Sequence, residues 1–199
     1  MLAVRQYFIV LSASILALVP STGFADFCEI MAGESAPSCR INAKNSGATI
    51  TGNWLKIKPE QGFKASTGKK AIFSSATSPA YTILGVRTKD KFRMTIDCFA
   101  GERSMRIQAL PYMLGLANGR NDAFNLTFYI DNKPAFKERW PLDWQRAELQ
   151  APQGSRLLNE LQGSQEVKIT TDGILGNKST VGYIYKLEGY DSVNTSLCL

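Results

Sequence analysis

Cysteine is the residue type with the clearest chemistry in this chain. There are four cysteines, and the chain contains no histidine. A cysteine can act as a nucleophile, bind zinc or form a disulfide. The common Ser-His and Cys-His catalytic pairs need a histidine, and the chain lacks the Cys-x₂-Cys spacing of a zinc site. The cysteines are therefore predicted to be structural: Cys28, Cys39, Cys98 and Cys198.

If the chain is exported, as the N-terminal pattern described below predicts, an even number of cysteines predicts disulfide bonds. Four cysteines allow three pairings. We favour Cys28 with Cys39, because this bond closes a short local loop. The remaining pair, Cys98 with Cys198, ties the last residues of the chain to a central strand. A bond from Cys39 to Cys98 would overturn this placement of the C-terminus.

Carboxylates are the next candidates, because glycosidases use two of them at a fixed separation. No spacing singles out a pair among those available, which are Glu102, Asp131, Glu138, Asp143, Glu148 and Glu160. The segment from Ser66 to Lys69 fits the Ser-x-x-Lys form of penicillin-binding enzymes, but Gly68 breaks the helix that would present both side chains, and the partner motifs are missing. We therefore expect a protein that is not an enzyme, with no metal and no cofactor.

Two tryptophans, Trp140 and Trp144, flank a proline after a hairpin whose turn runs from Asp131 to Pro134. Flat aromatic faces can line a groove for a peptide or a sugar, or they can form the rim of a core. In the binding hypothesis these tryptophans are anchors, and the rim consists of basic side chains from the same hairpin: Lys133, Lys137 and Arg139. Trp54 lies inside an apolar strand candidate and is predicted to be core.

The first 25 residues follow the order of a secretory signal peptide. Arg5 precedes an apolar run from Tyr7 to Pro20, and small and polar residues then lead to Ala25. The apolar run of about 14 residues is shorter than the roughly 20 that span a bilayer as a helix. We expect cleavage after Ala25 and a periplasmic protein with no later transmembrane segment. A retained membrane anchor is the alternative.

Short strands separated by turns must position these residues. Candidates rich in β-branched and aromatic residues cover 48–58, 81–86, 91–99, 104–110, 124–130, 135–140, 147–150, 166–171 and 181–187. Alternation places Phe92, Met94, Ile96 and Cys98 on one buried face. Short helices are predicted at 154–162 and 191–197. The pattern predicts a mainly β fold, either a β-sandwich or a strongly curved antiparallel sheet, with one or two short helices.

Composition divides the chain into three parts. These are a signal peptide (1–25), an N-terminal lead-in region packed on the body (26–79) and a main β domain (80–199). The net charge is +6, but the lysines and arginines are spread along the chain and interleaved with acids. This spread does not favour nucleic-acid binding.

Several short motifs resemble the type VI secretion-associated VasI-like periplasmic proteins. Seven features follow in the same order as in that family: an early cysteine pair, a strand tryptophan, a central strand that leads to a cysteine, a hairpin with a tryptophan, a Leu-rich helix, a strand that ends in Leu-x-Gly and a last cysteine. In this chain they are Cys28 to Arg40, Trp54, Lys91 to Cys98, Phe128 to Lys133 with Trp140, Leu157 to Leu161, Val181 to Gly189 and Cys198. The chain departs from that pattern at Pro37 to Arg40 and at Ser78-Pro79. The resemblance implies a non-enzymatic periplasmic accessory protein.

These observations favour an exported accessory or binding protein that contacts another envelope or secreted protein, such as a component of a secretion apparatus. Two alternatives remain open. One is an envelope protein that binds or hydrolyses peptidoglycan, and the other is a periplasmic inhibitor or immunity protein against a toxin or a lysozyme. The sequence leaves the oligomeric state undetermined.

Overall fold

The computed structural model describes residues 25–64, 67–85, 87–111, 113, 122–171 and 181–198. The expected leader up to residue 24 and Ser66 of the Ser-x-x-Lys motif lie outside the described residues. The strands are β1 (Thr49–Thr51), β2 (Trp54–Lys56), β3 (Glu60–Lys64), β4 (Lys69–Pro79), β5 (Thr82–Leu84), β6 (Arg93–Phe99), β7 (Glu102–Gln108), β8 (Ala123–Ile130), β9 (Phe136–Asp143), β10 (Glu148–Gln150), β11 (Glu166–Thr171) and β12 (Val181–Lys186). The helices are α1 (Phe27–Ala32), the 3₁₀ turn η1 (Gly33–Ser35), α2 (Ala36–Asn45), α4 (Leu157–Glu160) and α5 (Tyr190–Ser196).

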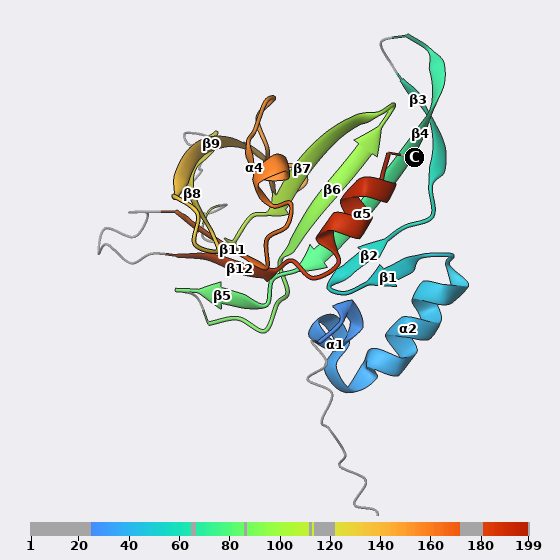
Figure 1. The fold of residues 1–199 in the computed structure, drawn as a ribbon, viewed down its shortest axis with the longest axis horizontal. Helices are drawn as coiled ribbons and strands as arrows, with labels where there is room; N and C mark the ends of the chain where they lie inside the picture. Colours follow the sequence, from blue (N-terminus) through green and yellow to red (C-terminus); the bar gives the residue numbers. More distant parts are fainter. Residues whose placement is uncertain are drawn as a thin grey trace, which may run out of the picture.

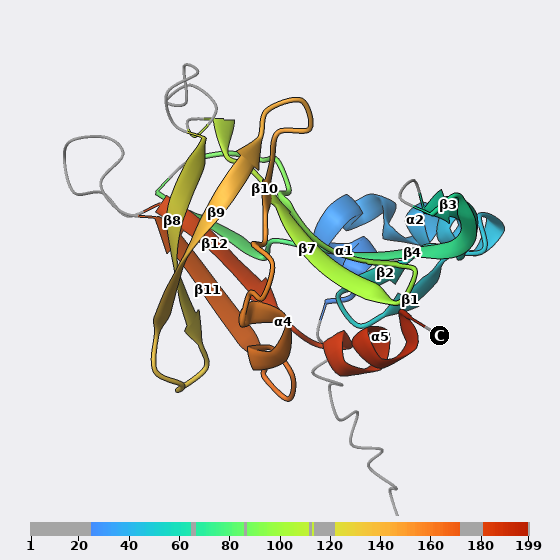
Figure 2. The ribbon, with the colours of Figure 1, turned by 90° about the horizontal axis from the view of Figure 1, so that it is seen from above.

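The described strands form one antiparallel sheet in the order β1-β2-β4-β6-β7-β10-β9-β8-β11-β12-β5, and β3 pairs with β4 beside this path. The sheet curves strongly (Figures 1 and 2). Its curvature brings the end of β4 close to the opposite end of the strand order. There the Ala80 N–H donates to the Phe92 carbonyl and the Tyr81 N–H donates to the Ile184 carbonyl. The fold is therefore mainly β, as predicted.

The core lies on the inner face of this curved sheet. Alternation along β6 buries Met94, Ile96 and Cys98, as the sequence predicted, and Trp54 is fully buried. Residues from both halves of the strand order meet in one cluster, which includes Met105, Phe128, Trp140 and Tyr183. The expectation for β6 was incomplete, because Thr95 and Asp97 on its other face are also buried.

The segment 26–79 contributes strands to the sheet as well as helices that pack against it. β4 pairs with β6 from Phe73 to Pro79, and the candidate strand 48–58 is a hairpin of β1 and β2. The turn between them includes Gly52, whose φ is 54°. A Cβ at Gly52 would collide with the backbone of Glu188, so glycine is required at this position.

Helices α1 and α2 were not expected from the sequence. Asp26 caps α1 and forms a capping box with Glu29. The guanidinium group of Arg40 in α2 lies 2.8 Å from the Asp26 carboxylate and 2.6 Å from the Glu29 carboxylate. Burial opposes ionisation of Asp26, but hydrogen bonds from Arg40 and from backbone N–H groups outweigh it and lower the pKa of Asp26. The Cys28–Cys39 disulfide joins the two helices. With Phe27 and Ala36, Cys28 forms a second small core.

Helix α5 lies on the opposite side of β4 and β7 from α1 and α2 (Figure 2). Tyr190 at its start packs against Trp54, with ring centroids 5.6 Å apart. The Lys56 ammonium donates to the Ser196 carbonyl at its end. The Cys98–Cys198 disulfide then joins the C-terminus to β6, so both favoured cysteine pairings are confirmed.

Candidate binding surfaces

The hairpin that the sequence suggested as a binding surface consists of β8 and β9. Trp140 is fully buried, and its ring packs 5.6 Å from that of Phe128. Its indole N–H donates to Glu138, whose carboxylate also accepts from Ser155 and from the Arg156 N–H. The prediction that Trp140 anchors a partner is therefore wrong, because the alternation of β9 turns this side chain into the core.

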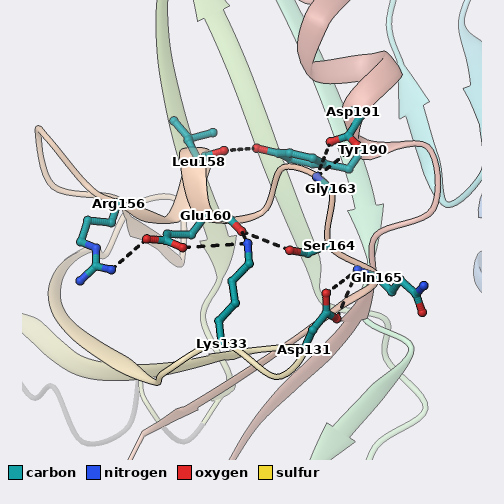
Figure 3. Close-up of polar contacts among 10 residues, drawn as sticks. All are labelled: Asp131, Lys133, Arg156, Leu158, Glu160, Gly163, Ser164, Gln165, Tyr190 and Asp191. Carbon is teal, nitrogen blue, oxygen red and sulfur yellow. Dashed lines mark hydrogen bonds and ion pairs between the residues drawn. The ribbon is translucent and has the colours of Figure 1, made fainter.

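Lys133 and the turn around it fix the α4 segment. The Lys133 ammonium donates to the Glu160 carbonyl and lies 4.0 Å from the Glu160 carboxylate. The Asp131 carboxylate accepts from the N–H groups of Gln165 and Glu166. Figure 3 shows the contacts of Lys133 with Glu160 and of Asp131 with Gln165. Lys133 thus holds the α4 segment in place, while its side chain is 40% exposed at the surface.

The same close-up shows how α5 is tied to this segment. The Tyr190 hydroxyl donates to the Leu158 carbonyl, and the Asp191 carboxylate accepts from the Gly163 N–H (Figure 3). Arg156 pairs with Glu160 across one helical turn at 2.8 Å, and this hydrogen bond lowers the pKa of Glu160. The ten residues drawn there hold α4 and α5 in place.

The other candidate residues of this hairpin do not gather around a tryptophan pair. Lys137 and Arg139 are exposed on the face of β9 opposite Trp140. Arg139 pairs at 3.1 Å with Asp122, and both side chains are largely exposed. Trp144 is 42% exposed just beyond β9. These residues therefore belong to more than one face of the molecule.

A different hairpin carries the most exposed large apolar side chains of the sheet among the described residues. β3 and β4 pair from Glu60–Phe73 to Lys64–Lys69 and extend past the end of β6 and β7 (Figure 1). Phe63 is 68% exposed and Ile72 is 54% exposed. The register puts Gln61 opposite Ile72 and Phe63 opposite Lys70, so Phe63 and Ile72 share one face. We call this pair the apolar strip.

The apolar strip continues into a pocket beside the C-terminal disulfide. This pocket has a volume of about 200 Å³ and is lined by Ile72, Ser74, Cys98, Ala100, Gly101, Leu197 and Cys198. It lies where the hairpin, the β6–β7 turn and the end of α5 meet. The pocket is large enough to accept one bulky side chain from a partner.

Two cations lie on the same face as the apolar strip. Lys70 is directly opposite Phe63 on the paired strand, and Arg103 of β7 is directly opposite Cys98. Both side chains are exposed. Arg103 also donates to the Asn194 carbonyl of α5 at 3.0 Å, which holds it at the edge of the pocket. The surface is therefore apolar along its centre and positively charged at its margins.

Backbone groups of β3 add a further binding element. Among the described strands, β3 pairs with β4 alone, so its outer edge is not covered by another strand. The hairpin is continuous with the sheet at its base, where Phe73 of β4 pairs with Glu60 of β3 on one side and with Phe99 of β6 on the other. An edge strand of this kind can accept an added strand from another chain.

The sequence did not point to this surface. Phe63 is a single apolar residue and Ile72 lies in the short apolar run Ala71-Ile72-Phe73, within a segment rich in lysine, glycine and serine. Their proximity depends on the register between β3 and β4, and the pocket depends on the Cys98–Cys198 bond. Gly68, the helix-breaking residue of the segment from Ser66 to Lys69, is the local signal that a hairpin turn was possible there.

Two observations concern the location of the protein. Both disulfides are compatible with an exported protein, because such bonds persist in oxidising compartments. Within the described ranges, no helix has the length and apolar character that a membrane span requires.

Comparison with known proteins gives little further information. No family model matches the chain, and no curated protein matches it. A solved structure that resembles it is the crystal structure of invasion associated protein B from Bartonella henselae. The sequence identity is 11% and the TM-score is 0.47, over 75% of this chain and 94% of that chain.

Proposed function

We propose that this chain is an exported binding protein that holds an extended, acidic segment of another envelope or secreted protein on the β3–β4 hairpin. The observation that carries the proposal is the apolar strip, in which Phe63 and Ile72 are 68% and 54% exposed on one face beside a pocket. Large side chains exposed together in this way are typical of an interaction surface.

The expected binding energy follows from the area that a partner would cover. Full burial of a Phe or Ile side chain contributes about 1.5 to 3 kcal/mol. An extended segment along the free edge of β3 would add backbone hydrogen bonds, and alternate side chains would point to the apolar strip. A bulky residue of that segment would enter the pocket beside Cys198.

The charge of the partner segment follows from the cations at the margins. Lys70 and Arg103 would attract carboxylates, which raises the association rate and disfavours basic competitors. The net charge of +6 acts in the same direction at longer range. An acidic segment is therefore favoured over a basic or neutral one.

The proposed cellular location and the proposed class of partner are supported by the sequence. The signal-peptide pattern supports export to the periplasm, and the resemblance to VasI-like proteins supports a component of a secretion apparatus as the partner. The buried Trp140 removes the earlier surface assignment, but the accessory role does not depend on it.

A random peptide library displayed on phage tests the proposal. The library is selected on the folded wild-type protein and counter-selected on the Phe63→Ser, Ile72→Ser double variant. We expect enriched peptides that alternate acidic and bulky apolar residues, with at least about tenfold weaker binding to the double variant. Enriched peptides that bind both proteins equally, or no enrichment, would contradict the proposal.

Matched controls separate this surface from other exposed apolar residues and from other ligands. Ile41 of α2 is 59% exposed but is not near the pocket, so Ile41→Ser should leave peptide binding unchanged. Vesicles of anionic phospholipid and sedimented peptidoglycan serve as alternative ligands. If either binds through Phe63 and Ile72 while peptides do not, the surface recognises the envelope itself and the protein-partner proposal fails.

A further inference from the structure

The Cys98–Cys198 disulfide forms part of the wall of the pocket into which the apolar strip leads. Both cysteines line this pocket, and so does Leu197, which follows α5. Ile72 of the apolar strip lines the same pocket. The binding surface and this covalent bond are therefore parts of one structure, so a change in the bond must change the pocket.

The bond is accessible from the pocket on the side of Cys198. Cys98 is only 3% exposed and belongs to the main core, whereas Cys198 is half-buried and packs against that core. Thiols reduce exposed disulfides more readily than fully buried ones. The Cys198 sulfur is therefore the one that a thiolate in the pocket would attack.

Helix α5 is also held by contacts that do not involve the disulfide. At its start, the Tyr190 hydroxyl donates to the Leu158 carbonyl at 2.6 Å (Figure 3). At its end, the Lys56 ammonium donates to the Ser196 carbonyl at 2.6 Å. Rupture of the bond would therefore release the residues after Ser196, which include Leu197 of the pocket wall, while the body of α5 keeps these contacts.

We propose that the Cys98–Cys198 bond is a redox switch of this pocket, which a dithiol protein of the cell envelope opens by reduction. The inference rests on the proposed function, since it concerns the regulation of the same surface. The oxidised form binds the partner segment. In the reduced form Leu197 and Cys198 leave the pocket wall, and the bulky side chain of the partner loses the contacts that they supply.

Reduction is a two-electron exchange between one disulfide and two thiols. A thiolate of the reductant attacks Cys198 Sγ and forms a mixed disulfide, and the Cys98 sulfur leaves as a thiolate and takes up a proton. The second thiolate of the reductant then attacks the reductant's own sulfur in the mixed disulfide, and the Cys198 sulfur leaves and takes up a proton. The reductant loses two protons and two electrons and becomes a disulfide, so the exchange balances.

Binding and reduction must oppose each other. A side chain in the pocket covers Cys198, so a bound partner protects the bond from thiolates. The partner also favours the oxidised form by the same factor by which reduction weakens its binding, because the two equilibria are linked. The switch can therefore be tested in both directions.

Disulfide reduction in the folded wild-type protein tests the first direction. The reductant is dithiothreitol, and the ligand probe is a synthetic peptide that alternates acidic and bulky apolar residues, acetyl-Glu-Phe-Glu-Leu-Glu amide. Alkylation of new thiols at timed intervals, followed by peptide mapping, gives a rate for each bond. At a peptide concentration of about ten times its Kd, reduction of Cys98–Cys198 should slow by about tenfold, and reduction of Cys28–Cys39 should keep its rate. Equal rates for Cys98–Cys198 with and without the peptide would overturn the proposal.

Paired variants test the other direction. The Cys98→Ala, Cys198→Ala double variant stands for the reduced form, and it should bind the peptide at least about tenfold more weakly than wild type. The matched control is Cys28→Ala, Cys39→Ala, which removes the bond between α1 and α2 and should bind as wild type. Equal binding by all three proteins refutes the switch and leaves the proposed function standing, whereas no binding to any of them contradicts both. If the first variant does not fold, the reduction rates of the wild-type protein decide alone.

Discussion

The two disulfides should contribute unequally to stability, because they close loops of very different length. Cys98–Cys198 spans 100 residues and Cys28–Cys39 spans 11. In the chain-entropy model these loops correspond to about 4.7 and about 2.8 kcal/mol at 25 °C. Removing the longer bond should therefore cost about 2 kcal/mol more than removing the shorter one.

The structure adds a reason to expect at least this difference. Cys98 lies in the main core, and its bond holds α5, whose Tyr190 covers Trp54. Cys28 belongs to the small second core. Fraying of α5 would therefore expose part of the main core, whereas loosening of α1 would affect the smaller cluster.

Paired alanine variants make the comparison, with Cys98 and Cys198 replaced in one and Cys28 and Cys39 in the other. Urea unfolding followed by tryptophan fluorescence gives the free energy of unfolding, and the urea dependence shows whether the unfolded chain has expanded. Equal losses in the two variants, or a larger loss when the N-terminal bond is removed, would refute the reasoning.

Three further predictions concern stability, each measured by urea unfolding. Burial raises the pKa of the Glu148 carboxyl in the folded state. The contribution of this carboxyl to stability is therefore fully present below its pKa in the unfolded chain, and it is lost as the pH rises through its pKa in the folded protein. Glu148→Gln should therefore be more stable than wild type near neutral pH but not in acid, and the opposite pH dependence would contradict this. Gly52→Ala should cost at least about 2 kcal/mol more than Gly33→Ala, since φ is positive at both but only Gly52 is crowded by backbone, and equal costs would refute it. Glu138→Ala should cost about 2 to 3 kcal/mol because its carboxylate accepts from the buried Trp140, the half-buried Ser155 and the exposed Arg156 N–H, whereas Asp122→Ala should change stability by less than about 0.5 kcal/mol. A small effect at Glu138 would show that these bonds are replaced by water.

The sequence predicted the features that depend on local alternation and on covalent chemistry. Met94 and Ile96 follow a period of two and are both buried, and Trp54 lies in the core as expected. The disulfide pairing followed from the short spacing of Cys28 and Cys39. These predictions needed no knowledge of the strand order.

The binding hypothesis for Trp140 did not take account of the same alternation along β9. In an extended strand Trp140 and Arg139 point to opposite faces, so they cannot both contact one partner. The hypothesis grouped them by proximity in the sequence. Alternation would have placed Trp140 with Leu142 on the inner face, where the structure has both.

The missed helices and the missed surfaces have different causes. The inward face of α2 consists of small residues, Ala36, Cys39 and Ala43, so its helical spacing is a weak apolar signal in the sequence. The apolar strip and the charged row of Asp97, Arg106 and Glu148 each bring together residues from paired strands. Asp97 and Glu148 lie on strands separated by β7, and only the register across β6, β7 and β10 places both beside Arg106.

The central claim is that the apolar strip binds another protein in the cell envelope. Photocrosslinking in living cells tests it most directly, with a photoreactive residue in place of Phe63, which is 68% exposed, and, as the control, in place of Ile41, which is 59% exposed. The account predicts a discrete protein adduct from position 63 that is absent from position 41, and whose crosslinked peptide is acidic. Adducts of equal intensity from both positions, or crosslinks from position 63 to lipid alone, would contradict it.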